Sequence, residues 1–131
     1  FTLLGSRFNN EGFARKTMSF SRIIIKSNKQ KVFPSLPAIE RVGDTVRGFY
    51  TTVLDDGDVG GDYYEIVTEE GRDNWIQFTE FDEKNRRIIG RFEIHLRLAP
   101  KQSLEPGAEP TIDFVDGTFD VLAPYDFVFD Q

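Results

Sequence analysis

The side chains best suited to chemistry in this chain are the carboxylates of one short stretch, 55–62, where glycines are interspersed with acidic residues. Its aspartates are Asp55, Asp56, Asp58 and Asp62. Carboxylate oxygens are hard ligands that suit Ca²⁺, and glycines let backbone carbonyls turn inward. The order of residues does not match an EF-hand loop, and Asp and Gly are also common turn formers. We therefore predict a loop, either a solvated connection or a calcium site. No other cofactor is expected.

His95 is the only histidine in the chain, so a catalytic triad would have to use it. It lies between Ile94 and Leu96 in an alternating stretch, on the same side as Glu93 and Arg97, which predicts an exposed cross-strand residue. The sequence contains no Gly-x-Ser-x-Gly elbow and no cysteine nucleophile. We therefore expect a protein that is not an enzyme, and we assign no catalytic residue.

Four aromatic side chains are the predicted binding residues, because rings can stack on a sugar or on a partner protein. They are Tyr50, Tyr63, Tyr64 and Trp75. Tyr63 and Tyr64 are adjacent in a strand-like stretch, so they point to opposite faces of the sheet. At least one of them is therefore expected outside the core, unless the strand is covered on both faces.

The elements that must position these residues are strands. The clearest is a hairpin, in which 75–81 and 87–98 flank the polar connection 82–85 and alternate between apolar and polar side chains. Further strands are predicted at 1–8, 17–26, 46–54, 63–68, 112–121 and 125–129, with a connection at 27–37 and one turn of helix within 36–42. About eight strands without an amphipathic helix indicate an all-β, mainly antiparallel fold, either a sandwich or a compact barrel. A length of 131 residues fits a single domain, 1–131.

One short phrase occurs twice, as Gly90-Arg91-Phe92-Glu93-Ile94 and as Gly117-Thr118-Phe119-Asp120-Val121. We expect the two strands that contain it to be adjacent or nearly so. In the second, the apolar residues before and after Asp116-Gly117 fall on opposite parities. One extra residue there restores the alternation, which predicts a β-bulge with Gly117 in the left-handed conformation.

Composition excludes some partners. The formal net charge is −6 and the sequence pI is near 4.8, which opposes sequence-independent binding to nucleic acid. No apolar run approaches the roughly 20 residues needed to cross a bilayer. The chain begins at Phe1 rather than Met, so we expect that a leader or further N-terminal residues precede it.

The second half of the chain carries a recurring pattern. The stretch 76–82 ends in an acidic turn, 88–94 contains Gly90-Arg91-Phe92, and 112–121 ends in Gly117-Thr118-Phe119-Asp120-Val121. This pattern resembles a group of small β-rich lipoproteins of Bacteroidota, the DUF6252-like families. The resemblance implies a secreted, lipid-anchored protein of the outer membrane, at the cell surface or the periplasmic face, and implies no catalytic residue. The chain departs from this group in one respect: it contains no cysteine that could carry the N-terminal lipid anchor, which is not visible in this sequence.

The predicted function is non-enzymatic: an accessory or structural subunit, a surface lipoprotein that docks on a larger outer-membrane protein complex. Sheet edges, exposed aromatic rings and long loops are the surfaces that such a fold offers to a partner. The alternative is a binding module. In that case Trp75 and the tyrosines hold a glycan, or the interior of a barrel holds an apolar ligand.

Overall fold

The computed structural model describes residues 2–35, 45–53, 60–99 and 107–123, and all regular structure in these ranges is β. The strands are β1 (Leu3–Phe8), β2 (Ala14–Ser21), β3 (Gln30–Pro34), β4 (Val46–Val53), β5 (Gly60–Ile66), β6 (Trp75–Asp82), β7 (Arg87–Leu98) and β8 (Thr111–Leu122). The predicted all-β fold of about eight strands is confirmed. The helical turn expected at 36–42 and the strand expected at 125–129 lie outside the described residues.

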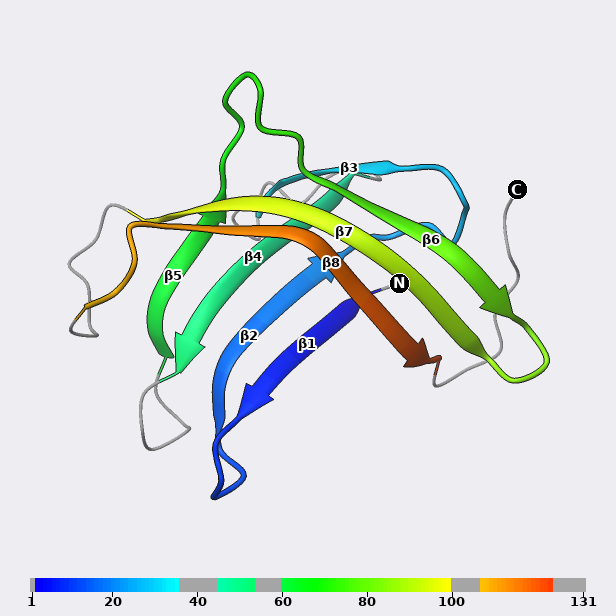
Figure 1. Cartoon of the computed structure of the whole chain (residues 1–131), viewed down its shortest axis with the longest axis horizontal. Helices are drawn as coiled ribbons and strands as arrows, with labels where there is room; N and C mark the ends of the chain where they lie inside the picture. The colour runs from blue at the N-terminus through cyan, green and yellow to red at the C-terminus, as the bar shows by residue number, and fades with distance from the viewer. Residues whose placement is uncertain (1, 36–44, 54–59, 100–106, 124–131) are drawn as a thin grey trace.

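All eight strands belong to one sheet, whose edges are β1 and β8. One half consists of β1, β2 and β4, and the other of β6, β7 and β8. β5 joins β4 to β7 at one end of the sheet, and β3 joins β4 to β6 at the other end. The pairings are antiparallel except that of β3 with β4. Figure 1 shows the resulting curl, with β7 and β8 arching over the strands of the first half.

The core lies between the two halves. Phe20 of β2 and Phe92 of β7 meet with their ring centroids 5.3 Å apart, and Phe20, Ile76, Phe78, Ile88 and Ile94 are almost fully buried. The central strands contribute alternate residues to this core, as the pleat of a strand requires. The fold therefore resembles a sandwich whose two layers are continuous through β3 and β5.

Several predicted element boundaries are wrong. The strand predicted at 63–68 is β5, which begins at Gly60 and ends at Ile66. The interval 27–37, predicted as a connection, contains β3, in which Gln30 and Val32 are buried. The strand predicted at 17–26 ends at Ser21, because Arg22 adopts a left-handed φ of 62°. Ile24 consequently does not continue the inner face of Met18 and Phe20, and its side chain is 38% exposed.

The predicted hairpin is confirmed as β6 and β7. Asp82 closes its turn by accepting two hydrogen bonds from Asn85, at 3.1 Å from the backbone nitrogen and at 2.6 Å from Nδ2. Arg86 follows with a φ of 56°. Asx side chains that bond to nearby backbone favour such turns. The hairpin is therefore specified by residues close together in the sequence.

The repeated Gly-x-Phe phrase forms a reciprocal contact between β7 and β8. Gly90 is paired with Phe119, and Phe92 with Gly117. A Cβ at Gly117 would lie 2.5 Å from Cζ of Phe92, and one at Gly90 would overlap the ring of Phe119 and the carbonyl oxygen of Gln77. Each phenylalanine thus covers the glycine of the other strand. The prediction that the two strands are adjacent is confirmed.

The expected irregularity in β8 is present, but it differs in detail. The register between β7 and β8 shifts between Phe92 and Ile94, and the left-handed residue is Asp116, with a φ of 60°. The assignment of that conformation to Gly117 is therefore corrected. Asp tolerates positive φ better than most residues do, whereas Gly117 is required by the ring above it.

Candidate functional site

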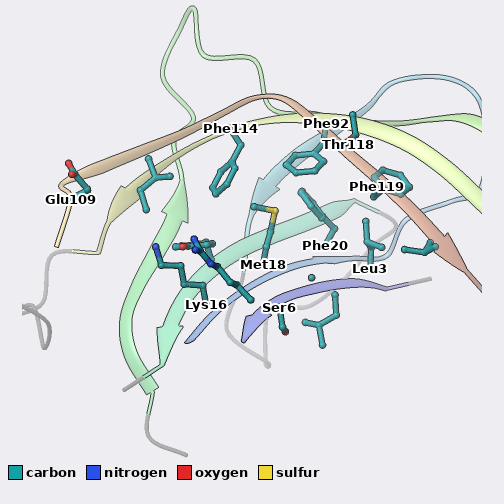
Figure 2. Close-up of a pocket in the computed structure, with 16 residues that line it drawn as sticks. Leu3, Ser6, Lys16, Met18, Phe20, Phe92, Glu109, Phe114, Thr118 and Phe119 are labelled. Carbon is teal, nitrogen blue, oxygen red and sulfur yellow. The ribbon is translucent and has the colours of Figure 1, made fainter. Parts of the chain in front are cut away.

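An apolar groove lies between the two halves of the sheet, on the side where β1 and β8 are not paired with each other. Its volume is about 590 Å³, within the range of small-molecule sites. Leu3, Met18 and Phe20 line it from one half, and Phe92 and Phe119 from the other. Figure 2 shows these side chains converging on the space between the halves.

The groove exists because the two edge strands are incompletely covered. Along β8, Ile112, Phe114, Phe119 and Val121 all face inward and are only half-buried. On β1, Leu3 alone is buried. Among the described strands, none fills the space beyond β8 and β1. The inward side chains of both edge strands therefore present apolar surface to the groove.

One end of the groove carries charge. Arg7 of β1 and Lys16 of β2 are directly opposite each other in the antiparallel register, and both line the groove. Glu109 lines the same end, and its backbone carbonyl accepts a 2.7 Å hydrogen bond from the hydroxyl of Tyr64. Figure 2 places Lys16 and Glu109 at this end, with Leu3 and Phe119 toward the other. The groove is therefore amphipathic along its length.

The predicted aromatic residues do not share one surface. Tyr50 and Tyr64 are buried, with their ring centroids 5.6 Å apart, and Tyr50 lines the groove. Tyr63 is 39% exposed on the opposite face of β5, where its ring stacks at 5.7 Å on Phe49. The prediction that the adjacent tyrosines point to opposite faces is confirmed.

Trp75 lies on the outer face of β6 and is half-buried. The Nζ of Lys29 is 4.0 Å from the centroid of its ring, and the guanidinium of Arg91 is 5.7 Å away. These are cation–π contacts, in which a cation lies over the face of the ring. The four predicted rings thus form a buried pair and two separate outer positions, so they do not build a single stacking platform.

The predicted acidic loop falls largely outside the described residues, which include only Asp62 of its four aspartates. The loop prediction is wrong for residues 60–62, which begin β5. Asp62 is 3% exposed there, and its backbone N–H donates a 2.7 Å hydrogen bond to Oγ1 of Thr52. Within the described part of the chain, no group of three or more acidic or histidine side chains is arranged to hold a metal ion. Calcium binding at Asp55, Asp56, Asp58 and Asp62 stays a prediction.

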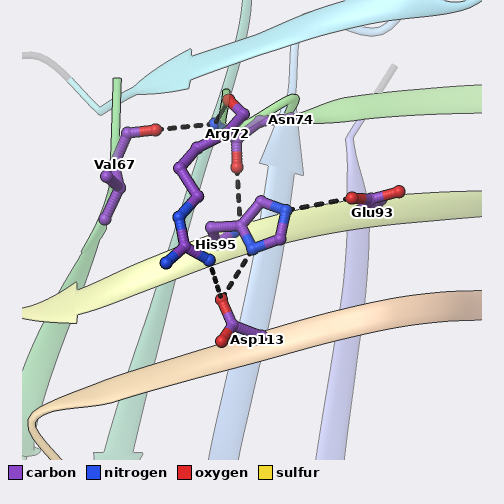
Figure 3. Close-up of polar contacts among 6 residues, drawn as sticks. All are labelled: Val67, Arg72, Asn74, Glu93, His95 and Asp113. Carbon is purple, nitrogen blue, oxygen red and sulfur yellow. Dashed lines mark hydrogen bonds and ion pairs between the residues drawn. The ribbon is translucent and has the colours of Figure 1, made fainter. Parts of the chain in front are cut away.

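His95 is buried, with 8% of its surface exposed, so its predicted exposure is wrong. It does occupy the outer side of β7, but the segment before β6 and the neighbouring side chains cover it. Its Nδ1 is 2.6 Å from Oδ1 of Asp113, and its Nε2 is 3.0 Å from Oε1 of Glu93 (Figure 3). Arg72 approaches the same Asp113 oxygen at 3.6 Å.

The same position marks a junction in the sheet. β7 pairs with β6 up to Glu93 and with β5 from Leu96 onward. Asn74, which is 4% exposed, fills the gap: its Oδ1 accepts from the His95 N–H at 2.7 Å, and its Nδ2 donates to Val67 O at 2.7 Å.

This geometry gives the cluster of His95, Glu93 and Asp113 a structural role. A triad histidine directs one ring nitrogen at a nucleophile. Both ring nitrogens of His95 instead contact carboxylate oxygens, and a cavity of only about 250 Å³ adjoins them. The cluster therefore ties β7 to β8 beside the junction.

Most residues of the groove were not predicted from the sequence as site residues. Met18, Phe20, Phe92 and Phe119 have the alternation of ordinary core positions, so nothing distinguishes a groove wall from a packed core. The sequence did contain a signal for Arg7 and Lys16. The two cations lie on either side of a turn at 9–13, and a turn between two antiparallel strands places such residues opposite each other.

Comparison with protein-family models, with curated proteins and with solved structures finds no significant match for this chain. The described residues contain no helix that is long and apolar enough to cross a membrane. The fold and the groove define a curled single-sheet β protein with an open apolar site. Function has to be inferred from that geometry.

Proposed function

We propose that this protein is a non-enzymatic binding module that holds an apolar ligand in the groove between the two halves of its sheet. The observation that carries the proposal is the groove itself, a space of about 590 Å³ walled by aromatic and aliphatic side chains. Ligand sites in β folds are commonly concave, mostly apolar and preformed, with few polar groups.

The walls are rigid enough to present such a site. Phe92 is fixed by its contacts with Phe20 and with Gly117, and Phe119 meets Phe78 edge-on at 5.6 Å. Side chains held on strands are positioned more accurately than side chains on loops. A ligand would therefore meet a surface that is already formed.

Gly5 provides the test. It lies on the inner side of β1 at the groove, and a Cβ built on it meets no atom within 4 Å. Gly5→Phe should therefore fill the groove without disturbing the fold. The matched control is Thr17→Phe on β2, which adds the same ring outside the groove.

The measurement is the fluorescence of an environment-sensitive apolar probe, titrated with each protein. We expect saturable binding to the original chain and to Thr17→Phe, and at least tenfold weaker binding to Gly5→Phe. Equal binding by all three proteins would place the probe elsewhere and reject the groove as the site. Thermal unfolding of each variant shows that it is folded.

A second candidate function is the accessory subunit that docks on a larger outer-membrane complex. The observation that favours it is the pair of sheet edges, where Leu4, Phe8, Val115 and Leu122 are 59–71% exposed. Edge strands with free backbone groups can accept a strand from a partner. The resemblance to lipid-anchored proteins of Bacteroidota agrees with such a location.

This second function is tested by gentle detergent extraction of the full-length protein, pull-down, and mass spectrometry of its intact mass and its companions. A lipid-modified N-terminus and a stoichiometric membrane partner are expected. Lysine at Val115 and Leu122 should abolish capture, because charge on an edge strand opposes pairing. A soluble protein recovered alone would reject this function and leave the binding module.

A further inference from the structure

We propose that the ligand of the groove is a single-chain amphiphile with an anionic head, of the class of a long-chain fatty acid, and that Arg7 and Lys16 bind the head. This inference rests on the groove being a binding site, as proposed above. It adds the chemical class of the ligand and the residues that select it.

The first observation is a pair of like charges in an unfavourable place. Arg7 and Lys16 are cross-strand partners on β1 and β2, and both line the groove. Like charges directly opposite each other destabilise a strand pair. Among the described residues, neither side chain makes a hydrogen bond or an ion pair. An anion between them would turn this repulsion into attraction.

The second observation is the position of this pair at one end of an otherwise apolar space. From Lys16 the inner face of β2 continues through Met18 and Phe20, and the facing wall continues through Phe114 to Phe119 (Figure 2). A carboxylate held by the two cations would therefore direct its hydrocarbon chain along the aromatic walls. A neutral ligand would leave the cations without a counter-ion.

Glu109 is the one carboxylate among the described residues that line this groove. Its backbone is held by the Tyr64 hydroxyl, but its side chain makes no ion pair with Arg7 or Lys16 in the described structure. The lining charges thus comprise two cations and one anion. Glu109 should oppose an anionic head, so Glu109→Gln is expected to tighten binding of a fatty acid.

The experiment compares a long-chain fatty acid with the alcohol of the same chain length, by displacement of the apolar probe from the full chain. The acid should bind about fivefold to tenfold more tightly, because each exposed cation contributes a modest, salt-screened attraction. The double variant Arg7→Gln, Lys16→Gln should bind both ligands equally. Lys29→Gln with Arg91→Gln, which removes the same two charge types from the outer face, should keep the preference.

The outcomes separate the two proposals. If the probe binds the groove but neither ligand displaces it, the apolar site stands and the single-chain amphiphile is rejected as its ligand. If acid and alcohol bind alike to the original chain, the site stands and the assignment of Arg7 and Lys16 is overturned. A third arm uses vesicles of anionic phospholipid. Binding to vesicles without binding to free fatty acid would assign the cations to a membrane surface and overturn the proposal.

A stability measurement provides an independent check on the double variant. In the original chain the charges of Arg7 and Lys16 repel each other. The double variant Arg7→Gln, Lys16→Gln removes this repulsion, so it should unfold at the same temperature as the original chain or at a higher one. In the original chain, the fatty acid should raise the unfolding temperature, as any ligand of the native state does. A marked loss of stability in the unliganded double variant would show that the two cations are structural and would contradict the proposal.

Discussion

At the scale of single residues, an exposed ion pair joins the start of β7 to the end of β8. Nε and Nη2 of Arg87 donate to the two carboxylate oxygens of Asp120 at 2.9 and 2.7 Å. This bidentate hydrogen bonding, followed by the charge of the guanidinium, lowers the pKa of Asp120 below its usual value. The pair also raises the pKa of Arg87.

The pKa of Asp120 can be tested by following its carboxyl carbon by NMR during an acid titration. Arg87→Gln should return the pKa of Asp120 to the usual range. It should hardly change that of Asp82, whose pKa is lowered mainly by hydrogen bonds from Asn85. Asn85→Ala should instead raise the pKa of Asp82 toward its usual value and leave the pKa of Asp120 unchanged. Identical titration of Asp120 in both variants would rule out the ion pair in solution.

The sign of the pH dependence follows from these shifts. A carboxyl whose pKa is lower in the folded chain stabilises the fold at pH values above its unfolded pKa. That contribution is lost as the pH falls through the folded pKa. Asp82 and Asp120 should therefore contribute nothing in strong acid and their full effect near neutrality. Both groups are exposed, so salt should weaken the contribution.

Asn74 is the residue on which the junction of the sheet depends. Its amide is buried and connects Val67, Arg72 and His95 through three hydrogen bonds. Asn74→Ala should destabilise the fold by about 2–3 kcal/mol, because it leaves buried backbone groups without partners. Denaturant unfolding measures this change. Asn28→Ala, at an exposed position, is the control and should stay within about 0.5 kcal/mol. A small effect at Asn74 would mean that water replaces the amide.

At the scale of elements, the reciprocal contact of glycine and phenylalanine holds β7 and β8 in register. Gly117→Ala should cost about 1–3 kcal/mol, because the added methyl overlaps the ring of Phe92 and the core is close-packed. The control is Gly5→Ala, where a Cβ meets nothing within 4 Å and stability should not fall.

A double-mutant cycle identifies the cause. Phe92→Leu makes room above Gly117, so Gly117→Ala should cost less in that background than in the original chain, by about 0.5–3 kcal/mol. Purely additive effects in denaturant unfolding would show that overlap with the ring of Phe92 is not the cause of the cost at Gly117. The repeated phrase would then have no common structural purpose in the two strands.

The elements that the sequence predicts well are those specified by near neighbours. The hairpin of β6 and β7 follows from alternation and from the Asp82–Asn85 turn, which lie within one continuous segment. β3 was missed because it is only five residues long and gains its stability from β4 and β6, which are distant in the sequence. The burial of His95 depends equally on Asn74 and Asp113, and alternation along β7 cannot show it.

At the scale of the whole molecule, the candidate site results from the curl of the sheet. The inward residues of β2, β7 and β8 were recognisable as apolar, but their exposure to a groove depends on which strands remain unpaired. That property is non-local, since β1 and β8 are separated by most of the chain. Sequence patterns therefore predicted most of the described strands and the hairpin but not β3, whereas the groove depends on the three-dimensional arrangement.

The open side of the molecule should also be its least stable part. β1 is paired only with β2, and five of its six residues are exposed, whereas β7 has partners along both edges. Local opening is favoured where few buried contacts hold a strand. Amide hydrogen exchange should therefore be faster in β1 than in the strands of the core. A saturating apolar ligand should slow exchange in β1 and β8 but leave the turn between β6 and β7 unchanged.

Gly5→Phe distinguishes groove binding from general stabilisation in this exchange experiment. A ring within the groove should slow exchange in β1 without ligand, and the ligand should then add nothing further. If the ligand instead slowed exchange uniformly over all strands, in both the original chain and the variant, it would bind outside the groove. Hydrogen exchange in β1 thus tests the open edges and the binding site together. The unpaired edges of β1 and β8 should both allow fast exchange and form the groove that the ligand fills.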